Sequence, residues 1–275
     1  RQDMDTTAKT ETSDSDGRTD SDKGDDITDT SSDEGTDSDD GTTETSSDDG
    51  STGSDDEGTD TDSGDGTTDD SSVEYGEGAT DIEGNTYKSV IIGEQEWMTE
   101  NLRTTKYSDG TAIANVKGDS EWYNLSTAAW CHYDNDNQYD TIYGKLYNWY
   151  AVETSKLCPT GWHVPTDSEW TELTDYLYSN GHSGEEGKAL KATSGWDDDG
   201  NGTDNYGWNG LPGGYRYGIG DFYSIGSISS WWSSSYYNTY FASYAWTRNL
   251  LNSFDDVSIG SNFKMFGYSV RCLRD

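Results

Sequence analysis

The chain is short of basic residues, aliphatic side chains and proline. Its 275 residues include 17 lysines and arginines against 54 acids, which gives a formal net charge of −37, and only 3 prolines. Such a charge repels the phosphates of nucleic acids and anionic membrane surfaces, so we expect neither as a partner. The sequence contains no run of 18 apolar residues, so we expect no membrane span.

Histidine is equally scarce, and this limits the catalytic arrangements that the chain can build. The three histidines are His132, His163 and His182. His163 lies inside the motif GWHVPT, where an imidazole more often packs beside a helix start than acts as a base. No G-x-S-x-G nucleophile motif is present. Acids are too abundant for a pair of catalytic carboxylates to stand out. We therefore expect a protein that is not an enzyme.

The first 72 residues lack aromatic side chains and cysteine altogether. They contain 29 serines and threonines, 26 acids and 9 glycines, and their only apolar residues are Met4, Ala8 and Ile27. Such a segment cannot bury enough apolar surface to offset the entropy of ordering. Residues 1–72 are therefore predicted to be an acidic low-complexity tail that is disordered on its own, and residues 73–80 a short bridge.

Four roles for this tail remain open. It can act as a solvated spacer, and its dense serines and threonines also allow an O-glycosylated stalk. Residues 14–22 (DSDGRTDSD) offer oxygen ligands of the kind that calcium prefers. Alternatively, the tail orders by packing against neighbouring subunits.

Residues 81–275 have the composition of one folded domain. They contain all 11 tryptophans, all 5 phenylalanines and all 3 cysteines of the chain. A length of 195 residues suffices for a substantial core. Each tryptophan or tyrosine can bury a large area, which compensates for the few aliphatic side chains.

The first half of this domain shows strand signals and one short helix. Residues 86–92 and 95–99 are predicted to form two strands joined at Gly93 and Glu94. Residues 107–140 are predicted to be irregular, and residues 145–153 to form a helix. Trp122, Trp130 and Tyr133 are expected to anchor the irregular segment, and the helix is expected to place Leu146, Trp149 and Tyr150 on one face.

The clearest helix begins at Thr166, which is predicted to form a capping box with Glu169. An apolar stripe follows at Trp170, Leu173 and Leu177, and Asn180-Gly181 ends the helix. A second capping box, Ser183 to Glu186, predicts a shorter helix through about Ala192. The remaining predicted strands are 214–217, 229–235, 243–250 and 267–273. Short helices among many short strands indicate an α+β fold.

Several motifs of this domain resemble the Fibrobacter succinogenes major paralogous domain family. In chain order they are IIGEQEWMTENLRTTKYSDGTAI (91–113), YGKLYNWYAV (143–152), CPTGWHVPTDSEW (158–170), LKATSGW (190–196), GTDNYGWNGLPGGYR (202–216), WWSSS (231–235) and GYSVRC (267–272). The resemblance covers nearly all of 81–275 and excludes the tail. It implies a secreted protein or lipoprotein of the Bacteroidetes–Fibrobacteres bacteria, with a molecular role that is largely undefined.

The segment VPTDSEW is also similar to a segment of formylglycine-generating-enzyme-like domains. This similarity implies a C-type-lectin-like fold, in which short helices lie beside a small loop-rich antiparallel sheet. Such domains join a cysteine near the first helix to one in the last strand, which implies a disulfide between Cys158 and Cys272. Cys131 is then the odd thiol. The enzyme's activity is not implied, because its pair of metal-binding cysteines has no counterpart here.

One loop resembles the first half of a calcium-binding EF-hand loop. Asp197, Asp199 and Asn201 occupy the ligand spacing, but Trp208 stands where a bidentate glutamate is needed. Asp204 and backbone carbonyls can complete a calcium site. The alternative is a turn whose side chains cap their own backbone. The EPN, QPD and WND motifs of sugar-binding C-type lectins are absent, which argues against calcium-dependent sugar binding.

Tryptophan rings can stack on sugars, and Trp231, Trp232 and Trp246 are the candidate ligand-binding residues. Neighbouring residues on a strand point to opposite faces, so Trp231 and Trp232 cannot both lie on one surface.

Together these features predict a bacterial protein that is secreted or displayed on the cell surface. We expect a non-catalytic binding or assembly role, in which the domain recognises a glycan or a surface protein. The alternative is a self-assembling subunit of an extracellular filament or surface layer, with a tail that orders against neighbouring subunits. An enzyme is the third and least favoured hypothesis.

Overall fold

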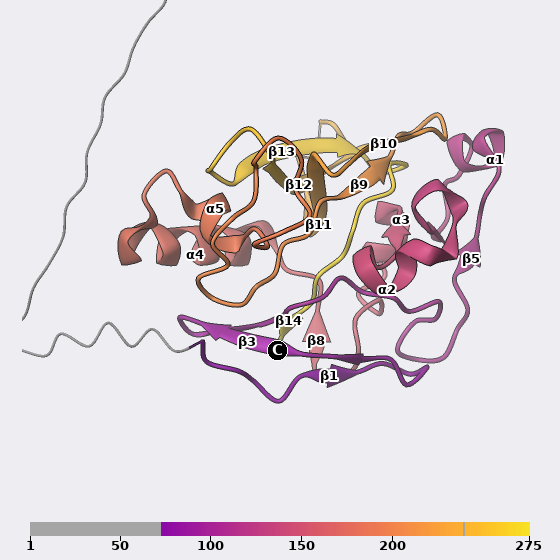
Figure 1. The fold of residues 1–275 in the computed structure, drawn as a ribbon. Coiled ribbons are helices and arrows are strands. Elements are labelled where there is room, and N and C mark those ends of the chain that lie inside the picture. The colour runs from indigo at the N-terminus through magenta and orange to yellow at the C-terminus, as the bar shows by residue number, and fades with distance from the viewer. Residues whose placement is uncertain (1–72, 239) are drawn as a thin grey trace, which may run out of the picture. The chain divides into compact units, whose positions relative to one another are not determined.

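A computed structural model describes residues 73–238 and 240–275 (Figure 1). The predictions about residues 1–72, namely the disordered tail, its glycosylation, its calcium binding and its packing, lie outside the described residues. The described part of the chain combines a few short helices with several largely antiparallel sheets. The α+β fold class is therefore confirmed.

The helices are short and the strands numerous. The α-helices are α1 (Asp119–Tyr123), α2 (Asp140–Tyr143), α3 (Trp149–Val152), α4 (Asp167–Leu177) and α5 (Glu186–Leu190). Two 3-10 turns and one π turn accompany them, η1 (Tyr133–Asn135), η2 (Asn137–Tyr139) and η3 (Tyr178–His182). The strands are β1 (Ala79–Thr80), β2 (Thr86–Tyr87), β3 (Ser89–Ile92), β4 (Gln95–Met98), β5 (Ala114–Asn115), β6 (Ala129–Cys131), β7 (Leu146–Tyr147), β8 (Trp162–His163), β9 (Gly213–Arg216), β10 (Phe222–Ile225), β11 (Ile228–Tyr236), β12 (Tyr244–Leu251), β13 (Ser258–Phe263) and β14 (Leu273–Arg274).

The strands form four small sheets. The largest has the order β10-β9-β11-β12-β13, and a second has the order β3-β4-β14-β8. In Figure 1 the five-stranded sheet lies in the upper part of the view and the sheet with β3, β14 and β8 in the lower part, and α4 and α5 lie at the left. The strands β5, β6 and β7 form the third sheet, and β1 with β2 the fourth. Two pairs, β9 with β11 and β5 with β6, are parallel. In the first case, β10 folds back from β9 and β11 reverses again, so β11 runs in the direction of β9.

Residues 73–80 are more than a bridge to the domain. Tyr75 makes a β-bridge to Val90, and β1 pairs with β2. The predicted hairpin of β3 and β4 is confirmed, with Gly93 in the turn at a φ of 64°. Glycine suits this turn because a positive φ strains any residue with a Cβ.

The predicted helix after Thr166 is confirmed in detail as α4. Thr166 caps it, and the reciprocal hydrogen bonds with Glu169 are both present. Its buried residues are the predicted stripe of Trp170, Leu173 and Leu177. The helix runs into the π turn η3, where Gly181 adopts a φ of 96° and stops it.

The second predicted capping box is wrong. Glu185, not Ser183, is the N-cap of α5, and no side chain caps this helix. The Glu186 carboxylate accepts a hydrogen bond from the backbone N–H of Gly184 instead. The helix also ends at Leu190, because the Lys191 backbone turns to an extended conformation there.

These two helix starts predict effects of different size when a hydroxyl is removed. We expect Thr166→Ala to lower the free energy of unfolding by about 1 kcal/mol, because the Glu169 backbone N–H loses the hydroxyl that accepts its hydrogen bond. Ser183→Ala is the matched control and should change it by less than about 0.5 kcal/mol. Urea denaturation of both variants measures the difference, and equal losses would contradict the assignment.

Three other predictions need correction. The segment 145–153 is not one helix, since Leu146 lies in β7 and only Trp149–Val152 is helical. The segment 107–140, predicted to be irregular, contains β5, α1 and β6, although its three anchors are buried as expected. The predicted strand 267–273 is mostly a buried connector that bridges to different sheets in turn. The alternation of apolar and polar residues predicted a strand with one buried face, but all residues from 267 to 273 are buried.

Two strands, β10 and β13, were not predicted. Their sequences FYSI and SIGSNF are half exposed and contain serine and glycine, so neither shows a clear apolar face. In contrast, β9, β11 and β12 match their predicted ranges to within one or two residues.

Aromatic rings dominate the core. One cluster centres on Trp149, Trp232 and Tyr268, and a second gathers Trp97, Trp170, Trp208 and Trp231 beneath α4. In the second cluster the Trp97 and Trp170 ring centroids are 4.7 Å apart. The prediction that aromatic side chains replace aliphatic ones in the core is confirmed.

Candidate functional site

Five aromatic side chains gather on the five-stranded sheet outside the core. They are Tyr237, Phe241, Tyr244, Trp246 and Phe263, and we refer to them as the aromatic surface. None belongs to any of the three buried clusters. Phe241 is 57% exposed and Phe263 39% exposed, and the other three are half-buried.

The strand register explains why these rings share one side of the sheet. Tyr244 and Trp246 are two residues apart on β12, so they point to the same face. Tyr244 pairs directly with Phe263 on β13. Tyr237 and Phe241 come from the β11–β12 connection, whose fold brings the Tyr237 and Trp246 rings within 4.7 Å.

Helix α4 covers only part of this face. Farther along β12, the same face carries Arg248 and Leu250, and Trp231 lies opposite Arg248 on β11. These three side chains are buried, and Arg248 forms an ion pair of 2.7 Å with Asp167 at the start of α4. The aromatic surface is thus the part of the face that α4 leaves uncovered.

The rings support one another closely. The ring centroids of Tyr244 and Phe263 are 4.2 Å apart, and those of Phe241 and Tyr244 are 6.1 Å apart. Such contacts hold the rings in fixed orientations. Partly exposed rings that are already ordered lose little conformational entropy when a ligand packs on them.

Only one of the three candidate ligand-binding tryptophans reaches this surface. Trp231 and Trp232 lie on opposite faces of β11, as predicted, but each is buried in a different core cluster. The indole N–H of Trp231 donates to Asn101, and that of Trp232 donates to the carbonyl of Tyr147. Trp231 and Trp232 therefore offer no ring face to solvent, whereas Trp246 is only half-buried.

The sequence signal for the other four rings was available. Residues 236–246 read YYNTYFASYAW, which contains six aromatic residues and no charge. We singled out only Trp246 because the turn that folds Tyr237 back onto it could not be inferred from the sequence.

The predicted calcium ligands do not converge. Within 73–238 and 240–275, no group of three or more His, Cys, Asp or Glu side chains could hold a metal ion. Asn201 accepts a hydrogen bond from the backbone N–H of Trp196, and Asp204 accepts one from that of Asn209. Asp199 lies in the same turn with a φ of 60°, and Asp197 accepts a hydrogen bond from the Ser227 hydroxyl. Asn201 and Asp204 thus cap the local backbone, as the alternative reading of this loop proposed.

The disulfide between Cys158 and Cys272 is present and links residues 114 positions apart. It joins the segment before α4 to the residue just before β14. Cys131 is a free thiol in β6 and is fully buried. Burial raises its pKa to about 12, although the nearby Arg216 acts in the opposite direction.

This burial predicts that Cys131 is inert in the folded protein. We expect a maleimide at neutral pH to leave it unmodified for hours and to modify one thiol per chain once urea unfolds the domain. Intact mass spectrometry counts the added groups. Cys131 packs in a third buried cluster with Val116, Trp122, Ala129, Tyr133 and Leu146. Rapid labelling of the folded chain would show that this cluster opens, which its packing argues against.

Each histidine already has neighbours that account for its position. His163 bridges two carboxylates, with Nδ1 2.7 Å from Asp275 and Nε2 2.9 Å from Glu169. The ring of His182 lies edge-on to Tyr206. Burial lowers the pKa of His132, and the adjacent Lys145 ammonium lowers it further. No serine, threonine or cysteine is hydrogen-bonded to any of these rings within the described residues.

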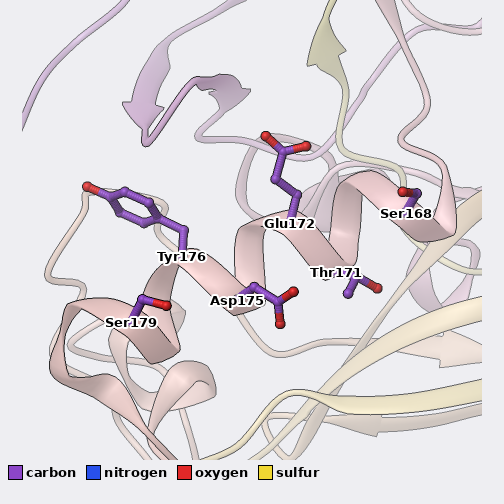
Figure 2. A pocket seen from close by; sticks show the side chains of 6 residues that line it. All are labelled: Ser168, Thr171, Glu172, Asp175, Tyr176 and Ser179. Carbon is purple, nitrogen blue, oxygen red and sulfur yellow. The ribbon is translucent and has the colours of Figure 1, made fainter.

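The described surface also contains shallow hollows. The one over α4 is lined by Ser168, Thr171, Glu172, Asp175, Tyr176 and Ser179, all from the α4–η3 segment (Figure 2). Five of these side chains are exposed to solvent. Two further hollows, of about 550 and 590 Å³, share Asp134 and Asn135 and are lined mainly by acids and amides. None of the three contains a tryptophan.

Nearly half of the domain's lysine and arginine side chains are buried, which is unusual for charged residues. Six of the thirteen lysines and arginines of residues 73–275 are buried, whereas Asp81 is the one buried acid among the described residues. Five of these six cations lie over tryptophan rings, with Arg271 3.8 Å from the ring of Trp208. The surface is therefore more acidic than the composition suggests.

Within the described residues, no helix combines the length and apolar composition needed to cross a membrane. The chain matches the Fibrobacter succinogenes major domain over residues 90–274, so it belongs to that family. The resemblance read from its motifs is thereby confirmed. Neither a curated protein nor a solved structure matches the chain.

Proposed function

We propose that this chain is a non-catalytic binding protein, secreted or displayed on a bacterial cell surface, that contacts its ligand through the aromatic surface. The observation that carries the proposal is the group of ordered, partly exposed rings around Trp246, which no described element covers. Contiguous exposed apolar surface of this kind marks interaction sites on soluble proteins.

The proposal includes a C-type-lectin-like fold for residues 81–275. Two features support it. Short helices lie beside small loop-rich sheets, and the disulfide joins a cysteine just before α4 to the chain just before the last strand, β14. In this proposal, the fold presents the aromatic surface on the part of the five-stranded sheet that α4 leaves uncovered. The acidic tail acts as a spacer between the domain and its attachment point.

A binding panel tests the proposal. The full chain is applied to immobilised collagen, fibronectin, mucin and a set of purified polysaccharides, and Trp246→Ala is compared with Tyr223→Ala. Tyr223 is a matched control, because it is a tyrosine on β10 that is 43% exposed and lies outside the aromatic surface.

The intact chain and the Tyr223 variant should bind the same member of the panel, and the Trp246 variant should lose that binding. Undiminished binding by Trp246→Ala, or no binding by the intact chain, would overturn the proposal. Electron microscopy of the same samples addresses the filament alternative. Ordered assemblies that form equally in both variants would favour a structural subunit.

A further inference from the structure

We propose that the aromatic surface binds an uncharged, extended polysaccharide. This inference rests on the proposed function and narrows its ligand to one chemical class. It follows from the spacing of the rings, from the lack of charged side chains among them, and from the negative charge of the rest of the protein.

The ring spacing suits a chain of cyclic units. Tyr244 and Trp246 follow one another on the same face of β12 at a separation of about 6.7 Å, from the rise of a β-strand. Phe263 lies beside Tyr244 on β13. A pyranose ring presents C–H groups on its faces, and these carry the slight positive charge that the electron-rich face of an aromatic ring attracts. Successive rings can therefore contact successive sugars.

Neutral hydrogen-bonding groups accompany the rings. Ser261 lies directly opposite Trp246 in the strand register, so its hydroxyl is on the same face. Trp246 is half-buried and adds an indole N–H, which is a hydrogen-bond donor. A sugar has both C–H and hydroxyl groups on its surface. It therefore fits a protein surface that combines aromatic rings with hydrogen-bonding groups better than a purely apolar ligand does.

The surface itself has no formal charge. Residues 236–247 and the whole of β13 contain no Asp, Glu, Lys or Arg. The nearest cation on β12, Arg248, is buried and paired with Asp167. A charged polymer would find no counter-ion on this surface, and the excess of exposed acids elsewhere repels anionic polymers.

The same charges argue against the other occupants. A second copy would bring its own net charge of −37 against the first, which opposes association. Residues 1–72 contain no aromatic and three apolar residues, so they lack side chains that could cover five rings. A neutral polysaccharide meets neither obstacle.

The test is a depletion assay with the full chain. Insoluble cellulose, mannan and β-1,3-glucan are the neutral probes, and calcium-crosslinked alginate and pectate gels are the anionic ones. The variants are Trp246→Ala and Tyr244→Ala, with Tyr223→Ala as the control. Circular dichroism and thermal unfolding establish that each variant is folded.

At least one neutral polysaccharide should deplete the intact chain, and added sodium chloride should not weaken its binding, because no ion pair is involved. Trp246→Ala should reduce the affinity about tenfold or more, and Tyr223→Ala should leave it unchanged. No depletion by any neutral probe, stronger depletion by the anionic gels, or an unaffected Trp246 variant would overturn the inference.

The two proposals fail differently. If a protein of the binding panel depends on Trp246 and no neutral polysaccharide binds, the aromatic surface is a protein-binding surface and only this inference falls. If no ligand depends on Trp246, both fall.

Discussion

Removal of the Cys158–Cys272 disulfide should lower the free energy of unfolding by about 4–5 kcal/mol. The bond closes a loop of 114 residues, and a long loop gives a large loss of unfolded-state entropy when it is crosslinked. A domain of this size has a total stability of about 5–15 kcal/mol, so the loss is a large fraction of it. Urea denaturation of the Cys158→Ala, Cys272→Ala double variant measures the change.

Two controls sharpen this experiment. A reductant should shift the urea midpoint of the natural chain toward that of the double variant and should not affect the double variant itself. Cys131→Ala keeps the disulfide and should remain sensitive to the reductant. Identical midpoints for the oxidised and reduced natural chain would contradict a stabilising role for this bond.

The second large effect is expected at Asn101. Its side-chain oxygen accepts hydrogen bonds from the Trp231 indole at 2.8 Å and from two nitrogens of Arg271, the nearer at 2.9 Å. Burial lowers the pKa of the Arg271 guanidinium to about 9, which shows how poorly the charge is solvated there. Asn101→Ala should cost about 3–5 kcal/mol, because a buried cation loses much of its hydrogen bonding.

Asn180→Ala provides the matched control. Asn180 is exposed, and its amide donates to a helical carbonyl at Tyr176, so we expect a loss below about 0.5 kcal/mol. Chemical denaturation at neutral pH compares the two variants. A small effect at Asn101 would mean that Arg271 is held mainly by the ring and the backbone carbonyl of Trp208.

The sequence predicted features whose signals are local. The capping box at Thr166, the stripe of Trp170 and the hairpin turn at Gly93 each depend on residues within a few positions, and all three are confirmed. Family motifs added what local patterns could not, since the pairing of Cys158 with Cys272 was implied by resemblance alone.

Features that depend on distant partners were missed. The ring of Tyr237 reaches Trp246 only because the β11–β12 connection folds back, and nothing in the sequence fixes that path. The spacing of Asp197 and Asp204 likewise did not reveal that these side chains accept hydrogen bonds from the Ser227 hydroxyl and the Asn209 backbone N–H. Burial of cations such as Arg216 was also invisible, since it requires carbonyls about a hundred residues away.

The buried connector before β14 has a consequence for the order of folding. Tyr268 bridges to β7, Ser269 to β11, and Leu273 pairs with both β4 and β8, so one short segment completes three sheets. These partners are far apart in the sequence, and such contacts form late because long loops must close first. A nascent chain that has not yet supplied this segment cannot close the domain. The strands of the three sheets would lack this common partner until residues 267–274 are available.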